Sequence, residues 1–334
     1  MFNALPLSNS KFVVAALFIV ALAVFFSVFG EQYHHAWVAP DNLIAPIMSL
    51  GSFVAGSTFL GGGAVAFPGL TKVLGASADT AKTFSLAIQS IGMTSASLYI
   101  LIRVRNLPIA FFSFFIPSTV LGLLLSLGFL DTLIVGNDLR IGFTLFLFVF
   151  MLVYLWAFSN KKDHYTDLGV LSLIDKNLIV KAGFLGGILS GLLGSGADLV
   201  AFCLLAFYFR LELKLATQIS VVIMAITSVF GTLFQWLVFN DITPQIKQLW
   251  LLAAPVVMIG APLGAMFCRR VTNRFLIVFI GVIVSIEVVS TVILIPFEFQ
   301  RSGYYISLVV LSISLLVLLH KISKRKKHTD QHLC

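Results

Sequence analysis

Long apolar runs separated by short polar segments make up most of the chain. About 20 helical residues span the hydrocarbon core of a bilayer, so an apolar run of roughly 18 residues or more predicts a transmembrane helix. Eight uninterrupted runs meet this criterion: 12–30, 80–102, 107–130, 139–159, 215–239, 249–267, 275–295 and 304–320. The first run is long for a signal peptide and is preceded by a single basic residue, Lys11, so an uncleaved helix is expected there.

Two further apolar segments, 43–75 and 178–210, contain glycine clusters near their middles. The clusters are Gly61-Gly62-Gly63 and Gly194-Ser195-Gly196. A glycine costs about 1 kcal/mol relative to alanine inside a helix, so such clusters predict a break in each segment. Each segment is therefore either a kinked crossing or a re-entrant hairpin that returns to the side from which it entered.

The positions of the 22 lysine and arginine residues distinguish these alternatives, because such residues concentrate in the cytoplasmic loops of membrane proteins. Two kinked crossings would leave 14 basic residues inside and 8 outside, with the N-terminus inside. Two hairpins would leave 17 inside and only five outside, namely Lys72, Lys82, Arg140, Lys247 and Arg301. The hairpin arrangement is favoured, and it predicts a cytoplasmic C-terminus.

The composition excludes several classes of protein. With 59% hydrophobic and 11% charged residues, the chain is not a soluble globular protein. The net charge of +8 then indicates membrane sidedness, and no nucleic-acid partner is expected. All six histidines lie in predicted loops or in the tail, which excludes a serine–histidine pair inside the bilayer. No Walker-type loop is present, and the three scattered cysteines predict neither a metal site nor a cofactor, so no enzyme is expected.

The landmarks of the first half of the chain recur in the second half. Gly61 matches Gly196 at an offset of 135 residues, and Ala81-x3-Ser85 matches Ala216-x3-Ser220 at the same offset. Pro117-x4-Gly122 matches Pro255-x4-Gly260 at an offset of 138. The matches predict a duplicated unit of one hairpin and three crossings. Three crossings is an odd number, so the second copy is inverted, as in many secondary transporters.

The fold predicted is therefore an all-α polytopic membrane protein built on an inverted repeat, with one extra helix at each end. Its parts are an N-terminal helix and outer loop (1–42), a first repeat (43–159), a cytoplasmic linker (160–177), a second repeat (178–295), and a final helix with a basic cytoplasmic tail (296–334).

The two glycine breaks are candidate sites for a small anion. Irregular backbone at membrane depth is tolerated only where it is buried in protein or lines a cavity. Glycine lets a ligand approach the freed backbone amides, and hydroxyl and amide side chains on the following helices supply further hydrogen bonds. The substrate-binding candidates are Gly61, Gly62, Gly63, Ser85, Gln89, Gly194, Ser195, Gly196 and Ser220, with Ser90, Thr94, Ser95, Thr227 and Ser228 as further hydroxyls.

The same residue types also have a purely structural interpretation. Gly183, Gly187 and Gly191 form a small-residue ridge that favours close helix packing, and Ser and Thr side chains often only join helices. Gln89 has the same alternative, since amide side chains also bridge helices. Packing therefore remains open for the individual hydroxyls and for Gln89, and it is favoured for the three glycines of the ridge.

Ionisable groups inside the membrane are rare and costly, so each indicates a function or a pairing partner. Asp198 lies at the second glycine break and Glu287 lies in the middle of a predicted helix. Either is a candidate proton carrier for coupled transport, or pairs with a basic residue such as Arg140 or Lys181. Lys72 follows the first break closely; solvation at a loop end is its expected role, with electrostatic attraction of anions as the alternative.

These motifs resemble the TauE/SafE family of membrane proteins, the sulfite exporters. The resemblance rests on Gly56-x4-Gly61-Gly62-Gly63-x4-Pro68-x-Leu70, on Gly187-x3-Gly191-x2-Gly194-x-Gly196, and on the Ala-x3-Ser element after each. It implies an inner-membrane carrier, usually an exporter, of small anions such as sulfite, organosulfonates and small carboxylates. Ala197-Asp198 stands where the family tends to have more glycine, and Cys203 stands in place of the proline that matches Pro68. The acidic tip favours proton coupling.

The sequence therefore predicts a secondary transporter of a small anion by alternating access, with the bilayer and the anion as its partners and a homo-oligomer left open. Two alternatives remain. A membrane scaffold would dock a partner through its tail and the 160–177 loop, and a gated channel would give flux that does not saturate.

Overall fold

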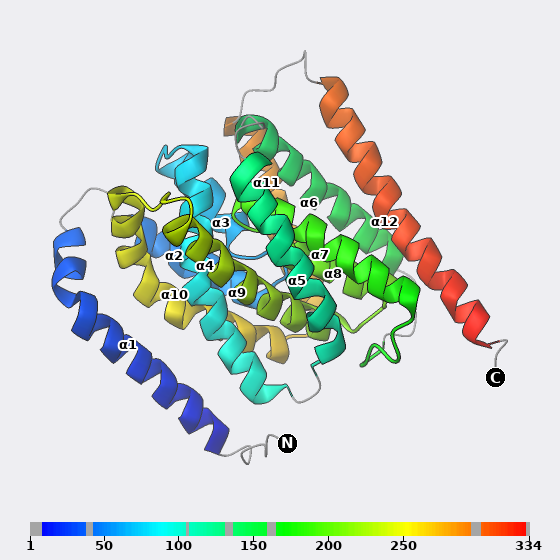
Figure 1. The fold of residues 1–334 in the computed structure, drawn as a ribbon, viewed down its shortest axis with the longest axis horizontal. Helices are drawn as coiled ribbons and strands as arrows, with labels where there is room; N and C mark the ends of the chain where they lie inside the picture. The colour runs from blue at the N-terminus through cyan, green and yellow to red at the C-terminus, as the bar shows by residue number, and fades with distance from the viewer. Residues whose placement is uncertain are drawn as a thin grey trace.

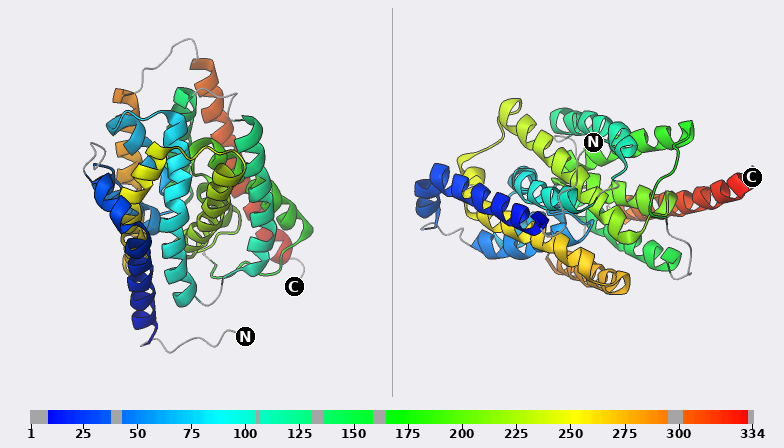
Figure 2. Two further views of the ribbon diagram at one scale, coloured as in Figure 1. Left: turned by 60° about the vertical axis from the view of Figure 1, so that its left-hand side comes forward. Right: turned by 90° about the horizontal axis from the view of Figure 1, so that it is seen from below.

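The structure is a computed structural model that describes residues 9–37, 43–104, 107–130, 136–158, 165–294 and 302–331. These residues are almost entirely helical and contain no β-strand beyond one isolated bridge between Tyr165 and Leu211. The helices form a bundle in which α1 and α12 lie at opposite edges (Figures 1 and 2). The helices are α1 (Asn9–Ala36), α2 (Ile44–Ser57), α3 (Gly63–Pro68), α4 (Ala78–Arg103), α5 (Ile109–Leu125), α6 (Gly136–Phe158), α7 (Leu173–Leu193), α8 (Ala197–Cys203), α9 (Leu213–Leu237), α10 (Pro244–Arg270), α11 (Asn273–Leu294) and α12 (Ser302–Gln331). Three of them, α3, α5 and α8, continue into the π-helical turns η2 (Gly69–Val73), η3 (Ser126–Leu130) and η4 (Leu204–Tyr208).

Seven helices among the described residues are long and apolar enough to span a membrane. They are Ala16–Ala36, Ala78–Arg103, Ile109–Leu130, Leu173–Leu193, Leu213–Leu237, Pro244–Arg270 and Asn273–Leu294. Six of them coincide with predicted crossings, which confirms a multi-pass membrane protein. The predicted crossings 139–159 and 304–320 fall on α6 and α12, which contain shorter apolar helices at Thr144–Leu155 and Tyr305–Leu319.

The seventh long helix, α7, was expected to be one arm of a hairpin, and the contacts around its N-terminal end agree with that expectation. Before α7, the backbone of Tyr165 bonds to Arg210 and Glu212, which follow η4. At the start of α7, the carboxylate of Asp175 accepts a hydrogen bond of 2.7 Å from the hydroxyl of Tyr208 in η4. The segment therefore returns to the end of the bundle where it starts, although α7 alone is long enough to cross.

The first glycine-broken segment doubles back in the same way. Gly51 in α2 lies against Val65 in α3, and closer to the start of α2 the side chain of Ile47 lies against Gly69 in η2. The two arms therefore run antiparallel around a break at residues 58–62. The helix that follows the first hairpin, α4, begins with a polar cap. Ser77 caps α4 by accepting a hydrogen bond from the backbone of Thr80.

Two helix pairs pack unusually closely, α5 on α7 and α2 on α10, and small residues make this approach possible. A Cβ on Gly122 would overlap the carbonyl oxygen of Phe184, and a Cβ on Gly56 would overlap that of Ala261. The ridge glycines behave as the packing interpretation predicts, since a Cβ on Gly187 would overlap the carbonyl oxygen of Thr119. The first arm of each hairpin is therefore packed closely against one helix of the bundle, α2 against α10 and α7 against α5.

Candidate functional site

The two glycine breaks are held open by backbone conformations that other residues adopt poorly. In the first break Gly61 has a φ of +68°, and in the second Gly194 and Gly196 have φ values of +76° and +147°. Side chains at these positions would be strained, which explains the glycines that the sequence places there. The second break is closed locally by Ser190, whose Oγ accepts a hydrogen bond of 2.8 Å from the amide of Ala197.

The tips of the two hairpins meet inside the protein, and Gln89 and Ser85 of α4 join them. The Gln89 Oε1 accepts a hydrogen bond from the Gly62 amide at 3.1 Å, and its Nε2 donates to the Gly194 carbonyl at 2.7 Å. The Ser85 Oγ accepts from the same Nε2 at 2.9 Å and donates to the same carbonyl at 3.1 Å. Both side chains are buried. Residues from three separate predicted segments therefore form one hydrogen-bonded junction.

The tips also interlock sterically. A Cβ on Gly63 would overlap the Oγ of Ser195, and a Cβ on Gly61 would overlap the Oδ2 of Asp198. Beside this contact Phe59 of the first tip stacks on Phe202 of the second, with ring centroids 3.7 Å apart. The junction is closed in this structure, and any ligand that reaches the tip amides requires the two tips to move apart.

Asp198 is the one acidic side chain among the described residues at this junction, and it is fully buried. Its Oδ1 accepts a hydrogen bond of 3.0 Å from the amide of Leu199. Its Oδ2, which faces Gly61, has no hydrogen-bond partner among the described residues. Burying a carboxylate oxygen without a donor is costly, so this oxygen is suited to carry a proton.

Not every predicted hydroxyl lies at the junction. Ser220 is buried, but its Oγ donates at 2.8 Å to the carbonyl of Thr217 in its own helix. None of the other predicted hydroxyls on α4 and α9 is joined to the tips. Thr94 is exposed, and the remaining four donate to carbonyls of their own helix: Ser90 to Ala87, Ser95 to Gly92, Thr227 to Ile223 and Ser228 to Ala225.

Glu287 pairs with Lys72, at an Nζ–Oε1 distance of 3.1 Å, and not with Lys181. The other expected partner, the Arg140 side chain, lies outside the described residues. The expectation that Lys72 is solvated at a loop end is wrong, because only 7% of its side chain is exposed. Hydroxyl groups fill the remaining positions around the pair. Lys72 also donates to Ser290 and Thr291 of α11, and Thr144 of α6 donates to Glu287.

This polar cluster, Lys72 with Glu287, Ser290, Thr291 and Thr144, is the main arrangement that sequence reasoning missed. One signal was present, because Glu287, Ser290 and Thr291 recur at helical spacing within an otherwise apolar run. A second omission is Gln235 of α9, which is fully buried and donates to Thr83 of α4 at 3.3 Å.

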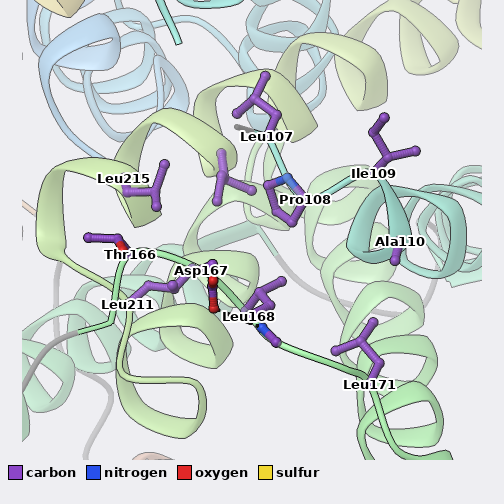
Figure 3. A pocket seen from close by; sticks show the side chains of 12 residues that line it. Leu107, Pro108, Ile109, Ala110, Thr166, Asp167, Leu168, Leu171, Leu211 and Leu215 are labelled. Carbon is purple, nitrogen blue, oxygen red and sulfur yellow. Dashed lines mark hydrogen bonds between the residues drawn. The ribbon is translucent and has the colours of Figure 1, made fainter. Parts of the chain in front are cut away.

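A pocket opens at the end of the bundle where α5 begins and the second hairpin ends (Figure 3). Its volume is about 470 Å³. Leu107 and Pro108 before α5 form one wall, the Thr166-Asp167 loop forms another, and Leu211 and Leu215 approach from the third side. The lining extends to Ile219, the residue before Ser220.

Comparison with known protein families decides the identity of this arrangement. The family model for the sulfite exporters TauE/SafE matches residues 44–290, which is 247 of the 334 residues. The chain belongs to the TauE/SafE family. The match begins at α2 and ends in α11, so it includes both hairpins and the junction but neither α1 nor α12.

Membership of the TauE/SafE family makes this protein a membrane transporter of sulfite-like anions and confirms the resemblance of the glycine motifs. Members of the family are transporters rather than enzymes. Comparison with curated proteins and with solved structures gives no match.

Proposed function

We propose that this TauE/SafE protein is a secondary transporter that exports a small anion by alternating access around the junction of the two hairpin tips. The observation that carries the proposal is the link from the Gly62 amide through Gln89 to the Gly194 carbonyl. Parting of the tips would release the Gly62 amide, the Gln89 amide group and the hydroxyls of Ser85 and Ser195. These are hydrogen-bond donors of the kind that a sulfite, a sulfonate or a carboxylate accepts.

Asp198 is the group that couples this movement to protons in our proposal. Its unpartnered Oδ2 is tolerated in the closed junction when it carries a proton. Protonation also removes the repulsion between a carboxylate and an anion bound at the same tip. By thermodynamic linkage, binding of the anion and of the proton then each favour the other.

Two inverted repeats, 43–159 and 178–295, are part of the same proposal. Three contacts between α5 and α7 have a counterpart between α10 and α2, when the α5 residues are shifted by 138 positions and the α7 residues by 135. The contact of Gly122 with Phe184 corresponds to that of Gly260 with Ser49. In the same way Leu123 with Gly191 corresponds to Ala261 with Gly56, and Ser126 with Ile188 corresponds to Gly264 with Phe53. Each hairpin is thus held by a helix of the other repeat. Glu287 takes no part in the proposed proton coupling, because it pairs with Lys72 in the polar cluster.

The proposed arrangement has eight crossings, with both chain ends on the cytoplasmic side of an inner membrane. Ser77 before α4 would then face outward and Ser172 before α7 would face inward. In a background without native cysteines, we expect an impermeant thiol reagent added outside intact cells to label Ser77→Cys and not Ser172→Cys. Labelling of Ser77→Cys from the inside alone would contradict the topology.

Flux measurements in proteoliposomes test the transport mechanism. We expect saturable, pH-gradient-dependent flux of at least one of sulfite, sulfoacetate, thiosulfate or a small carboxylate. Gly63→Leu should lower this flux by about tenfold or more, since overpacking a closed contact costs about 1–3 kcal/mol. The matched control is Gly30→Leu in α1, where a side chain meets nothing within 4 Å.

Asp198→Asn tests the coupling in the same assay. We expect the variant to fold and to lose the response of flux to an imposed pH gradient. If none of the anions moves, the transport proposal fails. If flux is normal and still follows the pH gradient in Asp198→Asn, Asp198 is not the coupling group.

A further inference from the structure

A hollow of about 560 Å³ lies between α1, α4 and α10, away from the tip junction. Most of its wall is apolar, formed by Phe18, Tyr99, Met258, Ile259, Pro262, Leu263 and Met266. Ile259 and Leu263 are each 48% exposed, so the hollow opens on the outer face of the bundle. In a membrane protein this face is in contact with lipid rather than water.

α1 borders this hollow loosely. The second half of α1 packs on α10 through the ring contacts of Phe25 and Phe29 with Trp250. Toward its start, Ile19 and Val20 are more than half exposed, and Phe18 is the residue of α1 that lines the hollow. The gap between α1 and the bundle therefore lies at the end where α4 and α10 finish.

Three arginines stand at that end of the hollow: Arg103, the last residue of α4, with Arg269 and Arg270, the last two of α10. None of the three has a carboxylate within 4 Å among the described residues. The Nε of Arg103 is buried and has no hydrogen-bond partner in the same set of residues. The hollow therefore has an apolar body and a positively charged end with unused donors.

We propose that this hollow binds an anionic phospholipid of the adjacent leaflet, with its phosphate on the three arginines and its acyl chains along α10. Basic pockets between transmembrane helices at this depth suit phospholipid headgroups, and arginine binds phosphate well through its planar fork of donors. A soluble anion would match the arginines but not the long apolar wall. The lipid fills the space between α1 and the two helices that position the site, since α4 carries Ser85 and Gln89 and α10 clamps α2.

Native mass spectrometry of the purified full chain, titrated with phosphatidylglycerol or with phosphatidylcholine of the same acyl chains, tests this site. We expect a tightly retained phosphatidylglycerol and no equivalent phosphatidylcholine. Arg103→Gln and Arg269→Gln should each weaken retention by about fivefold, the factor for about 1 kcal/mol per basic residue. The matched control is Arg274→Gln at the start of α11, which is exposed and does not line the hollow.

A second variant distinguishes a lipid bound inside the hollow from a lipid attracted to surface arginines by charge alone. Leu263→Trp fills the apolar wall without changing any charge, and it should reduce retention of phosphatidylglycerol as strongly as the arginine variants. Equal retention in Leu263→Trp and wild type would overturn the proposal, as would an equal effect of Arg274→Gln. Competition by glycerol 3-phosphate at the concentrations that work for the lipid would also overturn it, in favour of a soluble anion. All of these readouts are independent of anion flux.

Discussion

The two hairpins are anchored to the rest of the bundle by opposite kinds of interaction. The second arm of the first hairpin is tied by a directional polar cluster, in which Lys72 bonds to Glu287, Ser290 and Thr291 of α11. The second arm of the second hairpin lies instead among aromatic rings. Phe202 and Phe207 pack on Phe150 and Tyr154 of α6, with ring centroids 5.7 to 6.2 Å apart.

This difference has a physical consequence for movement. A buried ion pair surrounded by hydroxyls is satisfied in one register, because any displacement leaves a charge without its partner. Much of the stabilisation of aromatic contacts comes from non-directional burial of apolar surface, and offset-stacked and edge-to-face arrangements are both favourable, so these contacts change gradually as the rings slide over each other. We therefore expect the first hairpin to stay fixed on α11 and the second to be the more mobile of the two.

The largest effect should come from breaking the ion pair on one side. Glu287→Leu leaves the ammonium of Lys72 buried without a carboxylate, and removing one partner of such a pair costs about 3–5 kcal/mol. We expect a markedly lower thermal unfolding midpoint of the detergent-solubilised protein. The double variant Lys72→Met/Glu287→Leu should recover most of the loss, since no charge then remains.

The pair of buried Lys82 with exposed Asp79 provides the control for this experiment. Their charged atoms are 3.7 Å apart, and 85% of the Asp79 side chain is exposed. Asp79→Asn should change the midpoint far less than Glu287→Leu, because the Asp79 carboxylate is solvated and contributes little to its pair. A double variant at Lys72 and Glu287 that is no more stable than Glu287→Leu would contradict the idea of a directional anchor.

A smaller and graded effect is expected in the aromatic anchor. Phe202→Ala removes a buried ring and should cost about 3 kcal/mol, the lower end of the range for such changes. Phe202→Leu keeps much of the volume and should cost about half as much. Chemical denaturation of both variants measures this gradation, and equal losses in the two would contradict a non-directional anchor.

The smallest effects concern the two serines at matching positions of the repeat. Ser85→Ala removes hydrogen bonds that link the tips, so we expect a loss of about 1 kcal/mol and slower anion flux. Ser220→Ala removes a bond to the helix's own backbone, so stability should change by less than about 0.5 kcal/mol and flux should be unaffected. Flux measured in parallel for the two variants tests whether Ser85, and not Ser220, contributes to the site. Equal loss of flux in both variants would restore Ser220 to the site.

Much of this arrangement could be predicted from the sequence, for identifiable physical reasons. The breaks were visible because Gly61, Gly194 and Gly196 occupy conformations that only glycine accepts readily. Gln89 and Asp198 were visible because a polar group inside an apolar run requires a buried partner or a function. The crossings followed from the length of the apolar runs, and α7 shows why length alone does not separate a crossing from a hairpin arm.

What could not be predicted depends on contacts between distant parts of the chain. The offset that matches Ser85 with Ser220 predicts equivalent positions, yet the serine whose bond reaches the opposite tip is Ser85. The pairing of Lys72 with Glu287 joins residues 215 positions apart, and a single sequence holds no record of which basic residue a given carboxylate meets. Hydrophobic pattern places helices in the membrane but does not specify their neighbours.

That separation of 215 positions also has a consequence during synthesis. Chains grow at about 5–20 residues per second, so Lys72 is made roughly 10–40 s before Glu287. Throughout that interval the newly made first hairpin carries a lysine without its carboxylate, and until Gly196 is made it also has a tip without the opposite tip. The ion pair that anchors the first hairpin therefore forms only after most of α11 has been made, so one of the first-made parts of the bundle is fixed in place by one of the last.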